Sequence, residues 1–190
     1  MKLSYSLKSH LNKFFYLYIG AFILIPLVTF LTLNFKNKPK SYETYAVFVE
    51  ADVDSQGLKK HLQELLPEDL KITVHSAKQG ERSFASIYDA ESSVSDLIIV
   101  TESLAKTFEQ TPFVRLEETS YHNENNLRLY DREYGLPIKN NESNYYSNYI
   151  TYGEENYYLF IRENSVHSLG IKNDGKTNQN QRVLEDIYHV

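Results

Sequence analysis

The residues that could bind a ligand stand directly after three apolar segments that are rich in β-branched side chains. They are Asp52, Asp54, Ser76, Lys78, Arg82, Thr101 and Glu102. Their carboxylate, ammonium, guanidinium and hydroxyl groups are the donors and acceptors that hydrogen-bond a sugar or another small polar solute. The alternative is that they are ordinary loop residues and helix caps, roles that the same residue types favour.

Signatures of catalysis and of metal binding are weak in this sequence. Residues 52–57 (DVDSQG) imitate the start of a calcium loop, but its twelfth position is Gln63 where such a loop carries glutamate. The histidines lack metal-ligand spacing, and no nucleophile elbow, Walker loop or dinucleotide-binding glycine pattern is present. We therefore expect no enzymatic activity, no bound metal and no cofactor.

Six tyrosines crowd between residues 145 and 158 and allow two interpretations. They are Tyr145, Tyr146, Tyr149, Tyr152, Tyr157 and Tyr158. Tyrosine is favoured at protein interfaces, so the cluster is a candidate contact surface. The alternative is that these rings pack a strand and a neighbouring loop.

The elements that must position the polar residues alternate between strand and helix. We expect strands at Tyr45–Ala51, Leu70–Val74 and Asp96–Thr101. A helix is expected between the first two, because the leucines of residues 58–66 recur at helical spacing. In parallel sheets the carboxyl ends of the strands share one edge, and ligands bind beyond it. The order therefore predicts an α/β fold with a mainly parallel sheet.

The later part of the chain adds one more strand and a closing helix. Tyr157–Ile161 (YYLFI) has the aromatic and β-branched composition of a strand, and Gln179–Tyr188 has one apolar side at helical spacing. The continuous apolar run Leu97–Val100 is typical of a strand that is covered on both faces. We expect all four strands in one sheet.

The charge distribution divides the chain into two regions. Residues 1–40 hold six lysines and no acidic residue, which leaves 14 basic and 25 acidic side chains, a net charge of −11, in residues 41–190. A domain this acidic repels phosphate backbones, so we expect no nucleic-acid partner. Cysteine is absent, which excludes disulfides and thiol chemistry within this sequence.

A membrane segment is predicted near the N-terminus. Phe14–Phe35 contains 22 residues without a charge. A helix of that length reaches about 33 Å, enough for a hydrocarbon core of about 30 Å. The stretch is longer than the apolar region of a signal peptide, and no small-x-small cleavage pattern follows it. We expect an uncleaved single span at the cell membrane.

The expected organisation is a short tail (1–13), a transmembrane helix (14–35), a linker (36–44) and an α/β domain (45–190). Three lysines flank each side of the span, so the positive-inside count leaves the orientation open. We expect the domain to be extracytoplasmic, in part because of the following resemblance.

Three segments together with the opening strand and helix resemble a known family. They are Ser95–Phe108 (SDLIIVTESLAKTF), Tyr130–Ile138 (YDREYGLPI) and Glu155–Gly170 (ENYYLFIRENSVHSLG). This pattern is similar to the extracellular solute-binding proteins of ABC transporters, which have the type II periplasmic-binding fold. Members are usually about twice as long, with two lobes closing on a ligand. The chain thus resembles a single lobe, with a helix in place of the usual lipid-anchored cysteine.

The resemblance implies a function and a surface. The implied function is a membrane-anchored module that contributes to capture of a small solute, such as a sugar, by an ABC transporter. The alternative is a non-catalytic accessory subunit that binds the permease or another membrane protein. Both place the site at the edge formed by the polar residues above, with Tyr134 nearby at the segment that would cross to a second lobe.

Overall fold

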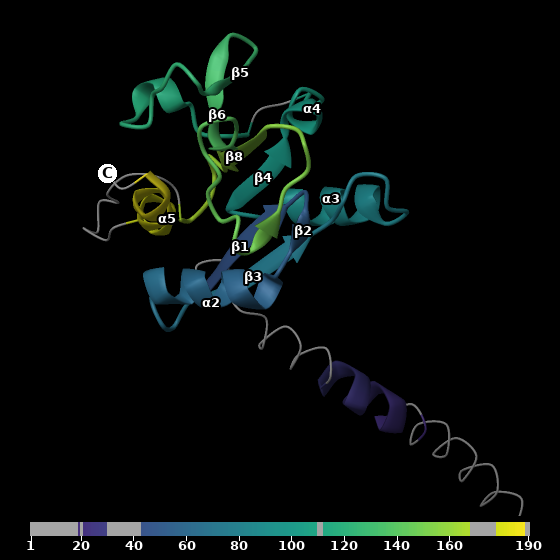
Figure 1. The fold of residues 1–190 in the computed structure, drawn as a ribbon. Helices are drawn as coiled ribbons and strands as arrows, with labels where there is room; N and C mark the ends of the chain where they lie inside the picture. Colours follow the sequence, from purple (N-terminus) through teal and green to yellow (C-terminus); the bar gives the residue numbers. More distant parts are fainter. Residues whose placement is uncertain (1–18, 20, 30–42, 110–111, 168–177, 189–190) are drawn as a thin grey trace, which may run out of the picture. The chain divides into compact units, whose positions relative to one another are not determined.

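The computed structural model describes residues 19, 21–29, 43–109, 112–167 and 178–188, and the chain divides into two compact units (Figure 1). The first unit comprises Met1–Pro39 and the second Lys40–Val190. The predicted tail and most of the predicted linker lie outside the described residues. The predicted α/β domain lies within the second unit.

The described part of the first unit is helical. Residues 19 and 21–29 form this helical part, and most of its large apolar side chains are exposed, Phe22 to 82%. Among the described residues, no helix combines the length and the apolar character that crossing a bilayer requires. The predicted span Phe14–Phe35 extends at both ends beyond what the structure describes, so it stays a prediction.

The second unit is built on one six-stranded sheet with the order β3-β1-β4-β8-β6-β5. The strands are β1 (Thr44–Val49), β3 (Lys71–Ser76), β4 (Leu97–Thr101), β5 (Leu127–Leu129), β6 (Arg132–Lys139) and β8 (Tyr157–Ile161). All four strands expected from the sequence lie in this sheet. A separate two-stranded sheet joins β2 (Asp52–Val53) to β7 (Ile150–Thr151).

The sheet is mixed in direction. Strand β1 pairs in parallel with both β3 and β4, as expected. Strand β8 runs antiparallel to β4 and to β6, and β5 runs antiparallel to β6. Strands β3, β1, β4 and β6 therefore share one direction, and β8 and β5 oppose it. Parallel pairing, expected for most of the sheet, is therefore found only among β3, β1 and β4, and the remaining pairs are antiparallel.

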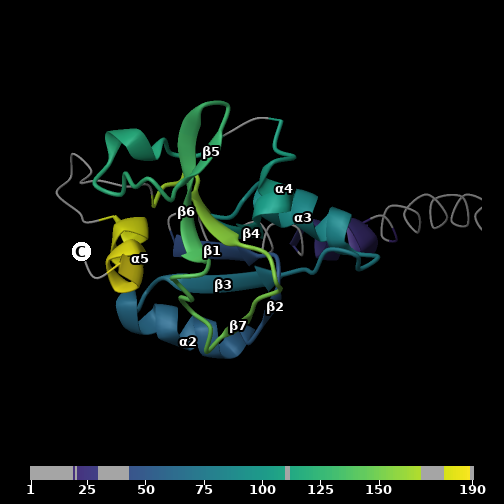
Figure 2. The same ribbon diagram turned by 45° about the horizontal axis from the view of Figure 1, so that its top comes forward.

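Helices cover both faces of the sheet (Figure 2). On one face, α2 (Ser55–Leu65) and α5 (Gln179–Tyr188) pack on the larger core cluster, which includes Tyr45, Val47 and Val49 of β1. On the other face, α3 (Phe84–Ser92) and α4 (Glu102–Ala105) lie over a smaller, aromatic cluster that includes Phe48 and Phe160. The alternation along β1 follows from the two-residue period of a strand. A short 3₁₀ helix, η2 (Leu116–Glu118), precedes β5.

Candidate functional site

The carboxyl ends of β1 and β4 form a topological switch point. The chain leaves β1, passes through α2 and enters β3 on one side, then returns across β1 to β4 on the other side. The connections that follow β1 and β4 therefore diverge. In open α/β sheets, ligands bind in the crevice that such a divergence leaves at the carboxyl edge.

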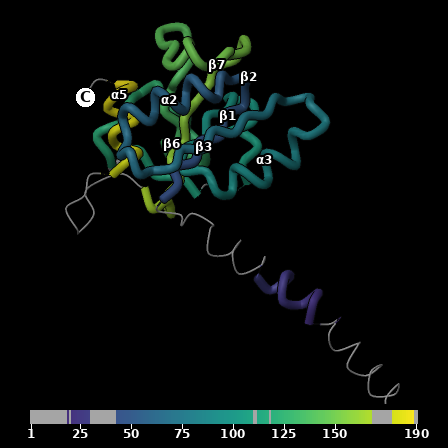
Figure 3. The backbone as a smooth tube through the Cα atoms, turned by 90° about the horizontal axis from the view of Figure 1, so that it is seen from below, coloured from purple at the N-terminus to yellow at the C-terminus, as the bar shows by residue number. Residues whose placement is uncertain are grey.

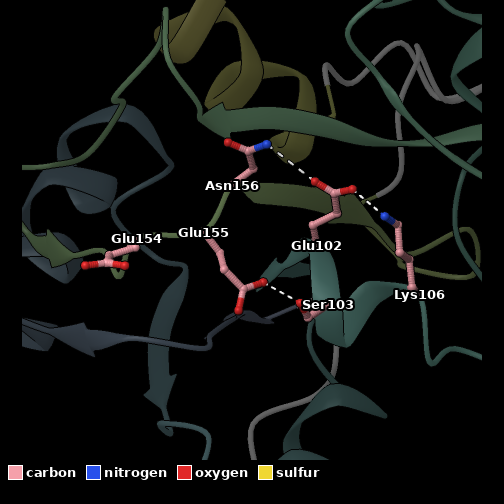
Figure 4. Close-up of a pocket in the computed structure, with 6 residues that line it drawn as sticks. All are labelled: Glu102, Ser103, Lys106, Glu154, Glu155 and Asn156. Carbon is pink, nitrogen blue, oxygen red and sulfur yellow. Dashed lines mark hydrogen bonds and ion pairs between the residues drawn. The ribbon is translucent and has the colours of Figure 1, made fainter.

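A polar cleft of about 340 Å³ lies at this edge (Figure 4). Its lining comes from α4, from the residue that follows this helix, and from the connection between β7 and β8. The lining residues are Glu102, Ser103, Lys106, Glu154, Glu155 and Asn156. The two segments meet because β8 is antiparallel to β4, so that Tyr157 at the start of β8 pairs with Thr101 at the end of β4.

The side chains of the cleft are linked to one another. The Ser103 hydroxyl donates to Glu155 Oε2 at 2.5 Å, which joins α4 to the β7–β8 connection. Lys106 Nζ donates to Glu102 Oε1 at 2.5 Å, and Asn156 Nδ2 donates to Glu102 Oε2 at 3.4 Å (Figure 4). Both oxygens of Glu102 thus accept a hydrogen bond.

The electrostatics of the cleft keep Glu102 charged. The hydrogen bond from Lys106 lowers the pKa of the Glu102 carboxyl, and the same contact raises the pKa of Lys106. The lining contains three carboxylates, those of Glu102, Glu154 and Glu155, and one ammonium group, that of Lys106. The cleft therefore favours cationic groups and hydrogen-bond donors over anions.

A buried glutamate lies at the same switch point. Glu50, which directly follows β1, is 2% exposed. Its Oε2 accepts from the Thr101 backbone N–H at 2.7 Å and from the Thr101 hydroxyl at 2.8 Å. Its Oε1 is buried and has no hydrogen-bond partner among the described residues. Desolvation by burial raises the pKa of this carboxyl, although the bonds from Thr101 oppose the shift.

Of the residues that the sequence singles out, Thr101 and Glu102 belong to this region. Thr101 is buried, and its hydroxyl oxygen caps α4 by accepting from the Leu104 N–H at 3.2 Å. Glu102 lines the cleft.

The remaining polar residues lie outside the cleft lining. Lys78 Nζ forms an exposed ion pair with Asp52 Oδ2 at 3.1 Å, which connects the segments after β3 and β1. Asp54 caps α2, since its Oδ1 accepts from the Gly57 N–H at 3.0 Å. Arg82 is exposed in the turn before α3. The structure therefore joins Asp52 to Lys78 but does not bring all the predicted residues to one site.

Tyr134 was predicted to lie near the functional edge, and the structure places it elsewhere. The end of β6 meets the cleft side of the sheet, because Lys139 pairs with Tyr157, and Lys139 Nζ donates to the Glu154 and Glu155 carbonyl oxygens. Tyr134 lies near the start of β6, at the opposite end. It is 5% exposed and belongs to the aromatic core cluster. Its ring is part of the core and not of a binding surface.

Five cleft residues were not among the predicted site residues. Ser103 lies on α4 and Lys106 directly follows that helix, and their position after a buried strand was the available signal. Glu154, Glu155 and Asn156 precede β8. Their presence at this edge depends on the direction of β8, and the sequence of that strand carries no signal for its direction.

The tyrosine cluster is mostly structural. Tyr157 and Tyr158 are buried, and the other four tyrosines are half-buried and pack against the larger core cluster. The Tyr146 hydroxyl donates to Asp186 Oδ2 at 3.2 Å, and the rings of Tyr146 and Tyr149 contact His61 of α2. This arrangement favours the packing interpretation of the cluster over the interface interpretation.

The chemical groups of the cleft lining are carboxylates, an ammonium group, an amide and a hydroxyl group. The hydroxyl group is that of Ser103, and its hydrogen-bond partner is the carboxylate of Glu155. Among the described residues, no three His, Cys, Asp or Glu side chains are grouped so that they could hold a metal ion. The cleft offers hydrogen bonds and charge.

We compared the chain with protein-family models, with curated proteins and with solved structures, and none of them matches it.

Proposed function

We propose that this chain is a membrane-anchored, extracytoplasmic solute-binding-like module that serves an ABC transporter by contributing to the capture of a small solute. The observation that carries the proposal is the polar cleft at the carboxyl edge of the sheet, between the end of β4 and the start of β8. The resemblance of residues 45–190 to solute-binding proteins and the apolar stretch Phe14–Phe35 support the transporter and membrane parts of the proposal.

The composition of the cleft narrows the class of solute. The carboxylates of Glu102, Glu154 and Glu155 are hydrogen-bond acceptors by their chemistry, so a solute that carries amino or hydroxyl groups fits better than an anion. None of the described residues that line the cleft is aromatic, so these residues would hold a sugar by its hydroxyl groups without stacking on a ring. The solute classes to test first are therefore small amines and sugars.

Titration calorimetry on the full chain in a mild detergent tests this proposal. Sugars, amines and small peptides are the probes, and the Glu102→Gln/Glu155→Gln double variant is expected to lose whatever binding the wild type shows. Glu142→Gln is the matched control, because Glu142 is an exposed carboxylate outside the cleft. If the folded wild type binds none of the probes, or if the double variant binds them equally well, solute capture at this cleft is contradicted.

A second candidate is a non-catalytic accessory subunit whose cleft edge binds a membrane protein. The specific observation in its favour is that the polar groups of the cleft already pair with one another, as Ser103–Glu155 and Glu102–Lys106 do. A small solute in an open cleft stays hydrated, and each polar contact then contributes only about 0.5–1.5 kcal/mol net. A few such contacts barely offset the several kcal/mol lost on association. A protein that covers the edge would add the missing desolvation.

Purification of the full chain from its own membrane in mild detergent, followed by mass spectrometry, separates the two candidates. A stoichiometric permease that is retained by the wild type and lost in Lys106→Glu, with no solute binding, favours the accessory role. Solute binding without any stoichiometric partner favours capture.

A further inference from the structure

The two edges of the six-stranded sheet differ in a way that points to an interaction surface. Strand β5, at one edge, has only three residues, and its pairing with β6 is interrupted by an irregularity at Leu127/Arg128. Strand β3, at the other edge, has six residues in unbroken register with β1 from Lys71 to Ser76. Short or bulged edge strands resist pairing with another chain, whereas a long regular edge invites it.

The outer edge of β3 presents unpaired backbone groups. Among the described residues, no strand pairs with β3 other than β1. Figure 3, which views the molecule from below, shows β3 with α2 lying to one side of it. The sequence of β3 (KITVHS) does not hinder the pairing of an added strand either, because it contains neither proline nor glycine.

The direction of the backbone groups identifies which residues face outward. The Ala77 N–H donates to the Val49 carbonyl of β1, so Ala77 faces β1. Since facing alternates along a strand, Ile72, Val74 and Ser76 direct their N–H and C=O groups away from β1. These are the groups that an added strand would meet.

We propose that β3 is a homodimer interface, at which the β3 strands of two copies of this chain pair antiparallel about a two-fold axis at Thr73. In this register Ile72 of each copy lies opposite Val74 of the other. Both residues face outward, so each such pair exchanges two backbone hydrogen bonds, as hydrogen-bonded pairs of an antiparallel ladder do. Thr73 lies opposite Thr73 on the axis.

Charge complementarity selects both the partner and the register. Lys71 is exposed at the start of β3 and comes to lie opposite His75 of the second copy. Within each copy, His75 Nε2 lies 3.4 Å from Glu91 Oε2 of α3. The ammonium group of Lys71 therefore meets the carboxylate that accompanies His75, once on each side of the axis. The neighbouring register, centred on Val74, would place Lys71 opposite Ala77 and lose this pairing.

Cysteine cross-linking of the full chain in mild detergent tests the proposal directly, because the chain contains no cysteine. In a non-hydrogen-bonded antiparallel pair the Cα atoms are about 4.5 Å apart, within the range that a disulfide spans. Thr73→Cys is therefore expected to form a disulfide-linked dimer on mild oxidation. Val74→Cys and Glu124→Cys are expected to stay largely uncross-linked, the first because Val74 is out of register and the second because Glu124 lies near β5.

Charge reversal and a proline substitution distinguish this interface from chance collisions. Lys71→Glu should reduce the cross-linked fraction of Thr73→Cys several-fold, and Glu91→Lys in the same chain should restore it. Val74→Pro removes an outward N–H and is expected to give a monomer by light scattering, with the circular dichroism of the wild type. A monomeric wild type over the accessible concentration range, cross-linking at Val74→Cys in place of Thr73→Cys, or Thr73→Cys cross-linking that does not exceed that of Glu124→Cys overturns the proposal.

Discussion

Two buried glutamates of this domain have opposite environments. Glu133 is 1% exposed, and its carboxylate accepts hydrogen bonds from Arg128 at 3.0 Å, His122 at 2.8 Å and Asn126 at 3.3 Å. Among the described residues, the carboxyl group of Glu50 accepts hydrogen bonds from Thr101 alone, all to one oxygen. Burial penalises the charge of both carboxylates, but only Glu133 has enough donors to overcome the penalty.

The charged Glu133 carboxylate is expected to contribute to the free energy of unfolding only at pH values above its folded-state pKa. Desolvation alone would raise the pKa of Glu133, but the hydrogen bonds from Arg128, His122 and Asn126 outweigh it and lower the pKa below the ordinary 4.5. The stability it contributes is present above the unfolded-state pKa and is lost as pH falls through the folded-state pKa. We expect Glu133→Gln to unfold about 1–3 kcal/mol more easily at pH 7.

Melting temperatures measured between pH 7 and pH 3 check this prediction. The difference between wild type and Glu133→Gln should shrink as the pH falls below about 4.5. Glu142→Gln, at an exposed position, serves as the control and should follow the wild type throughout. A constant difference at every pH would mean that Glu133 acts through packing alone.

Glu50 is expected to show the opposite pH dependence. Burial raises the pKa of Glu50 from the ordinary 4.5, so at pH values between the unfolded-state and folded-state pKa the folded domain holds a proton that the unfolded chain releases. Stability that depends on this proton is full below the unfolded-state pKa and is lost as pH rises through the folded-state pKa. Glu50→Gln should therefore gain stability relative to wild type as pH rises above about 4.5. Parallel melting curves for the two proteins would contradict it.

At the level of elements, Asp54 acts on a helix rather than on a ligand. Its side chain accepts from the Gly57 N–H at the start of α2, and Asp54→Ala should cost about 1 kcal/mol of unfolding free energy. Asp52→Ala is the matched control, because the Asp52–Lys78 pair is more than half exposed on both sides and should contribute nothing measurable. Urea unfolding of both variants checks the difference, and equal stability of the two variants would remove the capping role.

Tyr134 tests how β6 is held in the sheet. The ring is buried in the same cluster as Phe108 and Leu127, so Tyr134→Ala should destabilise the domain by about 3–5 kcal/mol. Tyr134→Phe keeps the ring and should stay close to wild type. Thermal unfolding of both variants measures the effect. A well-folded Tyr134→Ala protein with impaired partner binding would return this residue to the functional surface.

At the scale of the whole molecule, the second unit is expected to fold without the first. Every residue of the two buried core clusters lies between Tyr45 and Ile187. Residues 40–190 alone should therefore give a cooperative melt close to that of the full chain in detergent. The first unit should determine membrane association, so the full chain should float with lipid vesicles while residues 40–190 stay behind. Flotation of residues 40–190 alone would place the anchor elsewhere.

The sequence by itself determined the local elements. Strong composition and spacing located β1, β3, β4 and β8, and the leucine spacing of residues 58–66 located α2. The polar residues predicted after β1, β3 and β4 do follow neighbouring parallel strands, but the structure joins Asp52 to Lys78 and places only Glu102 of them in the cleft lining. These inferences need only local periodicity and the rule that crossover connections join parallel strands.

Only the tertiary structure decided which end of each later strand lies at the cleft. The composition of a strand indicates how buried it is but not in which direction it runs. The sequence therefore could not predict that β8 runs antiparallel to β4, which brings Glu154–Asn156 to the cleft. The same is true of Tyr134, whose position at the start of β6 puts it in the core. The environment of Glu50 could not be predicted from the sequence either, because the hydrogen bonds to its carboxyl group come from Thr101, which is distant in the chain.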